Sequence, residues 1–425
     1  MNKIKVLVFP CGSEVGLEIY RSLKYSRHIE LYGASSVKDH GRFVYDNYFG
    51  DLPFINDDDF IIELKKIIKR FEIDALYPAM DIAIAKLKSL EKELGCLVIS
   101  SPSLVSEICF SKKKTYTVLQ NIVPLPKVYD SMDEVDNYPV FIKPDVGYGS
   151  RGVKIINSYE EGKAHIRHWG DCLILEYLPN EEYTVDCFTD RNRELLFVGP
   201  RPRLRTRTGI SVNSVSIETK DRLEFQDLAN KINEKIPFRG AWFFQVKRNV
   251  HNELVLLEVA ARLGGSSSLY RYKGINFSLL SVFDAFNFDV NIIENDVQIE
   301  IERALDVKVK CDYFFDNVYV DFDDCLVIDG MVNTTLVAKI YEYINEGKKI
   351  ILLSKHRYDI RESLKKYKLE SLFDEIIHIR NLEDKKSKYI KNKSSIFIDD
   401  SYAERKDVHT SLGIPVYSPD MITVY

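Results

Sequence analysis

The chain has 425 residues, of which 45% are apolar and 29% are charged. At roughly 100 to 200 residues per domain, this length predicts several domains and excludes a peptide or a single small module. The apolar content also excludes a disordered chain. There are 59 Lys and Arg residues against 64 Asp and Glu residues, giving a formal charge of -5, so nucleic acid is not expected as a partner.

The cysteines and the apolar runs indicate the compartment. Seven scattered Cys residues without a C-x-x-C pair fit neither a disulfide framework nor a zinc site. The first apolar stretch, 6–9, is too short for a secretory signal, and nowhere do about 18 apolar residues run uninterrupted. We therefore expect a cytoplasmic protein with no membrane partner; a homodimer stays open.

The first region alternates buried strands with amphipathic helices. A buried strand ends at Phe9, and a helix that begins near Ser13 should turn Leu17, Ile19 and Leu23 inward. Further expected elements are strands at 30–34, 75–78 and 96–100 and a helix at 59–70. This alternation predicts a doubly wound α/β lobe over residues 1–105.

Two glycines follow the first strand. Gly12 and Gly16 lack the rest of the dinucleotide-binding fingerprint. Close packing of a helix on a strand is therefore favoured over dinucleotide binding.

A glycine-rich loop marks the middle region. Gly147, Gly149, Ser150 and Gly152 follow Lys143 in FIKPDVGYGSRG. Such a loop can bring backbone N–H groups to phosphates while the lysine supplies a charge. The glycines alone favour a flexible hairpin turn, and it is the later segments that favour a nucleotide site.

Several separate segments resemble the ATP-grasp superfamily, in particular carbamoyl phosphate synthetase and related carboxylate-amine ligases. They are FSKKKTYTVLQ, FIKPDVGYGSRG, LILEYLPNEEYTVD, FFQVKR and LLEVAARLGG. The resemblance implies an ATP-grasp domain over 106–305, preceded by a pre-ATP-grasp domain over 1–105. It also implies ATP with Mg²⁺, or Mn²⁺ in its place, and small-molecule carboxylate and amine substrates that are joined through an acylphosphate.

The same resemblance assigns roles to individual residues. The phosphate contacts that it implies are Lys112, Lys143, Gly147, Gly149, Ser150 and Gly152. The implied adenine and ribose contacts are Glu176, Tyr177, Leu178 and Glu182. The implied Mg²⁺ ligands are Gln245 and Glu258, with Arg262 beyond them as a catalytic residue.

One position departs from the family pattern. The second metal strand usually reads E-x-N-x-R, whereas here Ala260 takes the place of the Asn. Mg²⁺ prefers oxygen ligands but accepts water among them. Beside a working ligase, the sequence therefore leaves open a nucleotide-binding regulatory module with a decayed ligase site, and a small-molecule kinase.

Arginines recur at every second position in GPRPRLRTRTG. On a single strand this spacing would turn Arg201, Arg203, Arg205 and Arg207 to one face. A solvated edge strand and nonspecific nucleic-acid binding are alternatives. Related ligases place a P-R-x-R segment near the reacting phosphate, so an anion clamp with Arg201 and Arg203 deepest is the preferred interpretation.

Carboxylates follow the strands of the C-terminal region. Asp321 and Asp323 come directly after a buried strand, a spacing that lets one carboxylate act as nucleophile and the other as acid and base. Ser354 ends a second strand, and Asp399 and Asp400 follow a third. The carboxyl ends of parallel strands meet at one edge, so we expect these side chains to converge.

This set resembles the haloacid dehalogenase superfamily of phosphatases and implies a Rossmann-like domain over 312–425. The short spacings between its motifs leave little room for a cap domain. The implied roles are Asp321 as nucleophile, Asp323 as acid and base, Ser354 as phosphate anchor, and Lys386 or, second, Lys385 as charge partner. The implied Mg²⁺ ligands are Asp321, Asp323, Asp399 and Asp400. Cys325 stands where the family has Thr. Together the regions predict a ligase fused to a phosphatase-like domain.

Overall fold

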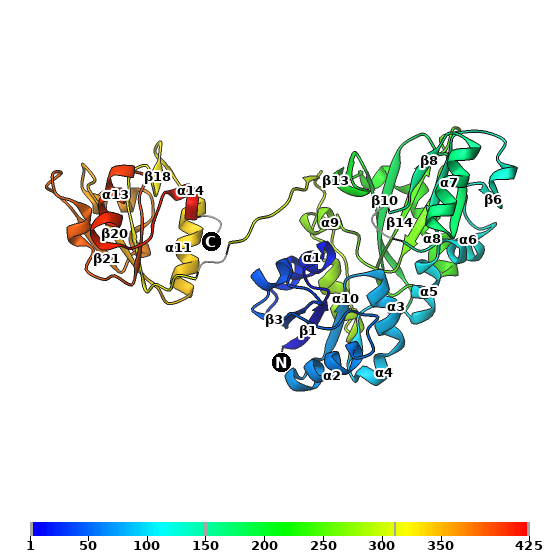
Figure 1. The fold of residues 1–425 in the computed structure, drawn as a ribbon, viewed down its shortest axis with the longest axis horizontal. Helices are drawn as coiled ribbons and strands as arrows, with labels where there is room; N and C mark the ends of the chain where they lie inside the picture. The colour runs from blue at the N-terminus through cyan, green and yellow to red at the C-terminus, as the bar shows by residue number, and fades with distance from the viewer. Residues whose placement is uncertain (1–2, 148–150, 310–311, 423–425) are drawn as a thin grey trace. The chain divides into compact units, whose positions relative to one another are not determined.

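The computed structural model describes residues 3–147, 151–309 and 312–422 (Figure 1). The chain divides into two compact units, Met1–Leu305 and Asp306–Tyr425. Each unit has hydrophobic clusters of its own. Within the described residues, no helix combines the length and the apolar run that crossing a bilayer requires.

A five-stranded parallel sheet opens the first unit, as the sequence predicts. Its strand order is β3-β2-β1-β4-β5. The strands are β1 (Ile4–Phe9), β2 (Ile29–Ala34), β3 (Asn47–Phe49), β4 (Ala75–Pro78) and β5 (Leu97–Val98). The helices are α1 (Glu14–Leu23), η1 (His40–Phe43), α2 (Phe60–Phe71), α3 (Asp81–Ser89) and α4 (Glu91–Leu94). The predicted mixed α/β class with a parallel sheet is confirmed.

Helix α1 begins where the sequence places it and lies close to the chain after β1. The Ser13 side chain accepts a hydrogen bond from the Gly16 backbone N–H at 3.0 Å, which satisfies an N–H group that the helix leaves unpaired. A Cβ atom at Gly16 would lie 2.5 Å from the Pro10 carbonyl oxygen. This glycine therefore serves close packing, as expected.

One face of α1 differs from the prediction. Ile19 and Leu23 are buried, but Leu17 is half-buried and Glu18 is buried in its place. The Glu18 carboxylate can be buried because the Arg271 Nε atom donates to it at 2.8 Å. A partner so distant in sequence cannot be read from the helical pattern.

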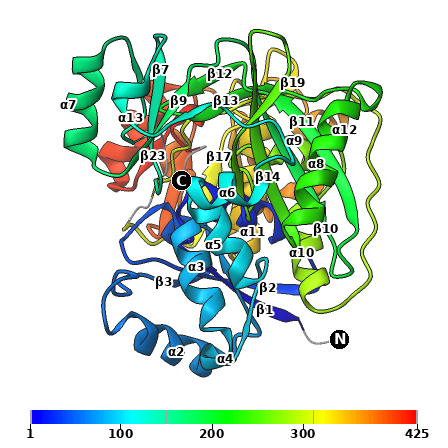
Figure 2. The ribbon, with the colours of Figure 1, turned by 90° about the vertical axis from the view of Figure 1, so that its right-hand side faces the viewer.

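A small antiparallel sheet follows, with strand order β6-β9-β7-β8. Its strands are β6 (Val128–Tyr129), β7 (Val140–Pro144), β8 (Lys154–Ile156) and β9 (Cys172–Glu176). The helices of this part are α5 (Ser103–Phe110), α6 (Lys112–Leu119), η2 (Met132–Glu134) and α7 (Tyr159–Trp169). Figure 2 shows α5 beside α3 of the first lobe, and the two helices are in contact.

The middle region also contains a larger antiparallel sheet, with strand order β11-β10-β14-β15. Its strands are β10 (Glu182–Thr189), β11 (Leu195–Pro202), β14 (Gly240–Arg248) and β15 (Leu254–Ala260). A third sheet contains β12 (Arg205–Arg207), β13 (Ile210–Val215) and β16 (Glu300–Glu302). The helices are η3 (Thr219–Asp221), α8 (Leu223–Lys235), α9 (Ser268–Tyr272) and α10 (Phe277–Ala285). The predicted division of this unit at residue 105 stays a prediction.

The second unit has its own parallel sheet, with strand order β21-β20-β17-β22-β23. The strands are β17 (Asn317–Val320), β20 (Lys349–Ser354), β21 (Glu375–His378), β22 (Ser395–Ile398) and β23 (Val416–Tyr417). A hairpin, β18 (Val327–Ile328) and β19 (Met331–Val332), follows β17. The helices are α11 (Thr334–Asn345), α12 (Ile360–Lys366), η4 (Glu370–Leu372), η5 (Lys386–Tyr389), α13 (Tyr402–Leu412) and α14 (Pro419–Ile422).

Candidate active sites

A row of polar side chains crosses the larger antiparallel sheet. Gln245 on β14 lies directly opposite Glu258 on β15. On the other side Gln245 faces Thr184 on β10, and Thr184 faces Arg201 on β11. Directly opposite residues of antiparallel strands share one face, so all four side chains lie on the same face of the sheet. The row places the two expected Mg²⁺ ligands side by side and adds Thr184, which the sequence analysis did not identify.

Lys143 on β7 is a buried cation. Its Nζ atom donates to the Leu257 carbonyl oxygen at 2.7 Å and to the Tyr116 hydroxyl at 3.2 Å. Burial lowers the pKa of Lys143 to about 8, although the negative charges of Glu258 and Glu182 oppose that change. The nearby carboxylates thus offset only part of the effect that burial has on the pKa of Lys143.

Lys112, the first residue of α6, is also influenced by the charge of Glu258. Its Nζ atom donates to the Asp145 carbonyl oxygen at 3.1 Å. Burial lowers the pKa of Lys112; the charge of Glu258 opposes this effect and that of Lys143 adds to it. An anion bound beside both lysines would stabilise their charged forms. The pair therefore fits a phosphate group.

Ala260 and Arg262 continue the strand that carries Glu258. Ala260 is buried and lies opposite Phe243 on β14, so a methyl group stands at the position of the family's Asn. The Arg262 Nε atom donates to an Asp81 carboxylate oxygen at 2.8 Å, and its guanidinium group lies 5.2 Å from the centre of the Phe243 ring. Arg262 is therefore paired with a residue of the first lobe.

The expected adenine and ribose contacts follow β9. The Glu176 carboxylate accepts the Lys127 backbone N–H at 2.9 Å. Tyr177 lies under the Lys247 ammonium group at 5.5 Å, and Leu178 is buried. The expected ribose contact has a partner of its own: Glu182 Oε1 lies 2.8 Å from Arg203 Nε.

The glycine loop is described only at its two ends. Gly149 and Ser150 lie outside the described residues. A Cβ atom at Gly147 would meet only Pro144, at 3.8 Å, whereas Gly152 has a φ of +71° and a Cβ there would lie 2.8 Å from Trp169. Gly152 is therefore required by the backbone and by packing.

The prediction of four arginines on one strand face is wrong. Arg201 lies on β11, but the chain leaves that strand after Pro202, so Arg205 and Arg207 lie on β12 in another sheet. Proline has no N–H with which to continue the ladder of hydrogen bonds.

Carboxylates of the protein itself meet most of this charge. Arg201 is buried, and its Nε atom donates to Asp186 Oδ2 at 2.6 Å. Arg203 pairs with Glu182, and Arg205 pairs with Glu302. The repulsion that seemed to require bound anions is thus relieved within the chain. A clamp by Arg201 and Arg203 stays a prediction.

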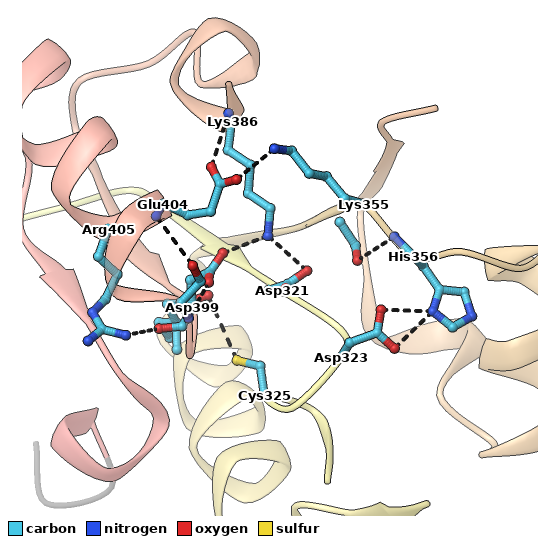
Figure 3. Close-up of polar contacts among 12 residues, drawn as sticks. Asp321, Asp323, Cys325, Lys355, His356, Lys386, Asp399, Glu404 and Arg405 are labelled. Atoms are coloured by element: carbon cyan, nitrogen blue, oxygen red, sulfur yellow. Dashed lines mark hydrogen bonds and ion pairs between the residues drawn. The ribbon is translucent and has the colours of Figure 1, made fainter. Parts of the chain in front are cut away.

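In the second unit, polar side chains converge at the carboxyl edge of the parallel sheet (Figure 3). Asp321 directly follows β17, Ser354 ends β20 and Asp399 directly follows β22. These three strands are neighbours in the order β20-β17-β22. The strand ends therefore bring together the residues that the sequence predicted would converge.

Lys386 joins two of these carboxylates. Its Nζ atom lies 3.0 Å from Asp321 Oδ1 and donates to Asp399 Oδ2 at 2.6 Å. Burial acts to lower the pKa of Lys386, but the two carboxylates outweigh it and the pKa is raised. The alternative partner, Lys385, is exposed and binds Asp407 at 2.8 Å. The structure therefore brings Lys386 to the cluster.

Asp321 and Asp399 both have a raised pKa. Burial raises the pKa of Asp321, and Lys386 opposes that effect. Burial raises the pKa of Asp399 to about 6, with the charge of Asp321 adding to it and Lys386 opposing it. Carboxylate oxygens of Asp321, Asp399 and Asp400 all lie within 4.8 Å of one another. Such an arrangement fits Mg²⁺, which binds carboxylates and water.

Asp323 turns to a residue that the sequence analysis did not identify. Both oxygens of its carboxylate lie 2.9 Å from the Nδ1 atom of His356 (Figure 3). A histidine that follows a strand-ending serine by two positions is the only local signal for this contact. Cys325 is buried and its Sγ atom lies 3.8 Å from the Ile398 carbonyl oxygen, so the position of the family's Thr is occupied by a packed thiol.

Comparisons with known proteins find similar sequences and similar folds. Residues 168–308 match the family described as ATP-grasp in the biosynthetic pathway with Ter operon. A D-alanine–D-alanine ligase of Fusobacterium nucleatum is 27% identical over 164 residues, which are 36% of this chain and 57% of that protein. The corresponding ligase of Thermotoga petrophila is 30% identical over 129 residues, 28% of this chain and 43% of that protein. The chain thus spans about half the length of these relatives.

Solved structures share the fold. The biotin carboxylase domain of Hydrogenobacter thermophilus 2-oxoglutarate carboxylase, solved with MgADP and bicarbonate, has a TM-score of 0.60 at 16% identity and covers 71% of this chain and 74% of its own. The L-amino acid ligase of Bacillus licheniformis has a TM-score of 0.55 at 16% identity, covering 67% and 74%. Residues 168–308 thus match an ATP-grasp family model, and much of the chain shares the fold of these solved structures.

Proposed function

We propose that the first unit is an ATP- and Mg²⁺-dependent ligase that joins a carboxylate to an amine. The observation that carries this proposal is the electrostatic link between one carboxylate and two lysines: the charge of Glu258 acts on the pKa of Lys143, which is buried, and of Lys112, which is half-buried. Cations beside a metal-ligating carboxylate suit a nucleotide whose phosphates carry Mg²⁺. The D-alanine–D-alanine ligase relatives and the L-amino acid ligase neighbour support the same reaction class.

The chemistry asks the protein mainly for alignment and neutralisation of charge. A substrate carboxylate oxygen attacks the γ-phosphorus of ATP, and the bond from that phosphorus to the bridging oxygen breaks. ADP departs, and the substrate is now an acylphosphate. The amine then attacks the acyl carbon and displaces phosphate. Lys112 and Lys143 would bind phosphate oxygens, and Gln245 and Glu258 would hold Mg²⁺, which supplies charge neutralisation when bound.

A second proposal concerns the C-terminal unit, which we infer to be a haloacid dehalogenase-like phosphatase domain over residues 312–425. Asp321 would attack the phosphorus of a phosphomonoester while Asp323 gives a proton to the departing oxygen. Water, deprotonated by Asp323, would then release phosphate from the aspartyl phosphate. Asp321, Asp399 and Asp400 fit Mg²⁺ by their clustered oxygens, and Lys386 and Ser354 would bind the phosphate oxygens.

One observation favours a different role for the first unit. The buried methyl group of Ala260 removes an oxygen that the family offers to Mg²⁺, which suits a nucleotide-binding regulatory module without turnover. The ligase and the regulatory module differ in a measurable way. A ligase forms ADP when its carboxylate substrate is present, whereas the regulatory module forms none.

The experiment that tests the ligase is ATP turnover by the full chain against a panel of carboxylates, each with and without amines. ADP and free phosphate that require both substrates would support ligation. ADP with a stable phosphorylated product and no need for an amine would indicate a kinase. ATP binding by calorimetry without any product would indicate the regulatory module.

A further inference from the structure

The contact between Asp323 and His356 has no place in the proposed hydrolysis so far. We propose that His356 is a positioning residue that holds the carboxylate of Asp323 in the orientation that general acid and base catalysis requires. This inference rests on the proposed phosphatase function of the second unit. It adds to that function a residue that acts on the reaction through Asp323 and not by touching the substrate.

The geometry of the contact restrains the carboxylate. His356 Nδ1 lies 2.9 Å from both Asp323 oxygens, so the ring faces the carboxylate symmetrically. The His356 side chain is 8% exposed, whereas that of Asp323 is 52% exposed. A half-exposed carboxylate would otherwise sample several rotamers. The buried ring therefore fixes the direction of an acid that remains open to a substrate.

The imidazole ring is itself held from several sides. Its Nε2 atom lies 2.8 Å from the Ser363 hydroxyl oxygen on α12. It packs against the Phe322 ring in a T-shaped arrangement, with 4.8 Å between the ring centres. With the proton on Nδ1, the ring donates to Asp323 and accepts from Ser363, which satisfies both nitrogen atoms. The orientation of Asp323 thus depends on the packed interior.

The backbone of His356 ties this contact to the phosphate anchor. Its N–H donates to the Ser354 hydroxyl at 3.2 Å, and its carbonyl oxygen lies 2.7 Å from His378 Nε2. Ser354 ends the strand next to β17, from which Asp321 and Asp323 follow. One short segment therefore sets the positions of both the anchor and the general acid.

The role has a specific kinetic signature. Proton donation matters most when the departing oxygen is strongly basic, as in an alkyl phosphate, and least for an activated aryl phosphate. Loss of the His356 contact should therefore slow the two substrates unequally. A defect of folding or of Mg²⁺ binding would slow both alike.

The test uses the full chain with Mg²⁺, an alkyl phosphomonoester and 4-nitrophenyl phosphate. His356→Phe keeps a packed ring without nitrogen atoms, and it should lower kcat for the alkyl ester about 10- to 100-fold, part of the ~10² to 10⁴ that general acid–base catalysis contributes. The loss for the aryl ester should be smaller, and KM should change little for both. His356→Asn places an amide N–H near the position of Nδ1 and should restore part of the alkyl rate.

His409→Phe provides the matched control, because His409 lies on α13 and its ring Nδ1 atom lies 3.1 Å from the Ile414 carbonyl oxygen, not from any residue of the proposed site. Equal losses for both esters in His356→Phe, or no rescue by His356→Asn, would overturn the positioning role. Hydrolysis that Asp321→Asn abolishes but His356→Phe leaves unchanged would overturn the role of His356 alone. A wild-type chain without hydrolysis would overturn the proposed phosphatase and this role with it.

Discussion

Gln245 lies directly opposite Glu258 on neighbouring antiparallel strands, so their side chains share one face of the sheet. In the proposed ligase these two side chains would offer oxygen ligands to one Mg²⁺ ion. The buried Lys143 responds to the charge of Glu258. The proposed ligase site can therefore be tested through single residues on either side of it.

Lys143→Ala and Glu258→Ala should each strongly lower the rate of carboxylate-dependent ADP formation. Each removes a charge at the transferring phosphate, where one lost contact costs about 3 kcal/mol, or about 100-fold in rate. Steady-state ADP release is the measurement. Lys163→Ala is the control, because that lysine forms an exposed ion pair with Asp133. Near-normal turnover in both site variants would refute the ligase.

Ala260→Asn should lower the Mg²⁺ concentration needed for half-maximal ligase activity, since it adds the oxygen ligand that relatives have. Ala260→Val is the matched control, because it adds similar bulk without an oxygen. The Mg²⁺ dependence of ADP formation checks both. An unchanged requirement in Ala260→Asn would mean that water already completes the metal shell.

ATP affinity should fall as the pH rises through about 8, the pKa to which burial lowers Lys143. Below that pH the free protein carries the ammonium charge, and above it the charge is lost, so the phosphates lose a cation. Calorimetric titration between pH 7 and pH 9.5 measures this dependence. Lys143→Arg should remove the decline, because a guanidinium group keeps its proton in this range; an equal decline in that variant would exclude Lys143 as the cause.

Asp321→Asn should lower phosphomonoester hydrolysis by several orders of magnitude and leave ADP formation unchanged, because an amide cannot form an aspartyl phosphate. Asp323→Asn should also be slow, yet it should let a phosphoenzyme accumulate. Intact-protein mass spectrometry after mixing with substrate detects that adduct. Asp324→Asn is the control; its φ is 51°, a conformation that Asn tolerates. An adduct on a residue other than Asp321 would contradict the assignment.

Arg201→Met should destabilise the first unit by about 3 to 5 kcal/mol, because it leaves the Asp186 carboxylate buried without its partner. Thermal or denaturant unfolding measures this loss. The double variant Arg201→Met, Asp186→Leu should recover most of it, since neither charge then remains in the interior. A double variant as unstable as the single one would show that Arg201 and Asp186 stabilise the unit by more than compensating each other's charge.

Local patterns predicted much of the fold. The strand predicted at 75–78 occurs at that position, and a strand ends directly before Asp399 as expected, because a buried parallel strand is an unbroken apolar run that needs no distant information. The meeting of Asp321, Ser354 and Asp399 was also predictable, since it follows from strand direction alone.

What could not be predicted depends on partners from other strands and helices. Arg201 looked like an anion ligand because Asp186 becomes its partner only when β10 and β11 pair. Thr184 gained its place in the polar row from the same sheet register. Contact between His356 and Asp323 requires two loops at neighbouring strand ends, a relation that no periodicity encodes.

The core around α1 limits how this chain could be divided. Val15 and Ile19 of that helix belong to the same hydrophobic cluster as Phe197 and Tyr270, which lie far along the chain. A shortened protein that began at residue 106 would expose the aromatic half of this cluster to water and would be prone to aggregate. The first lobe and the fold that follows it therefore share one core, and a shortened chain that keeps one should keep both.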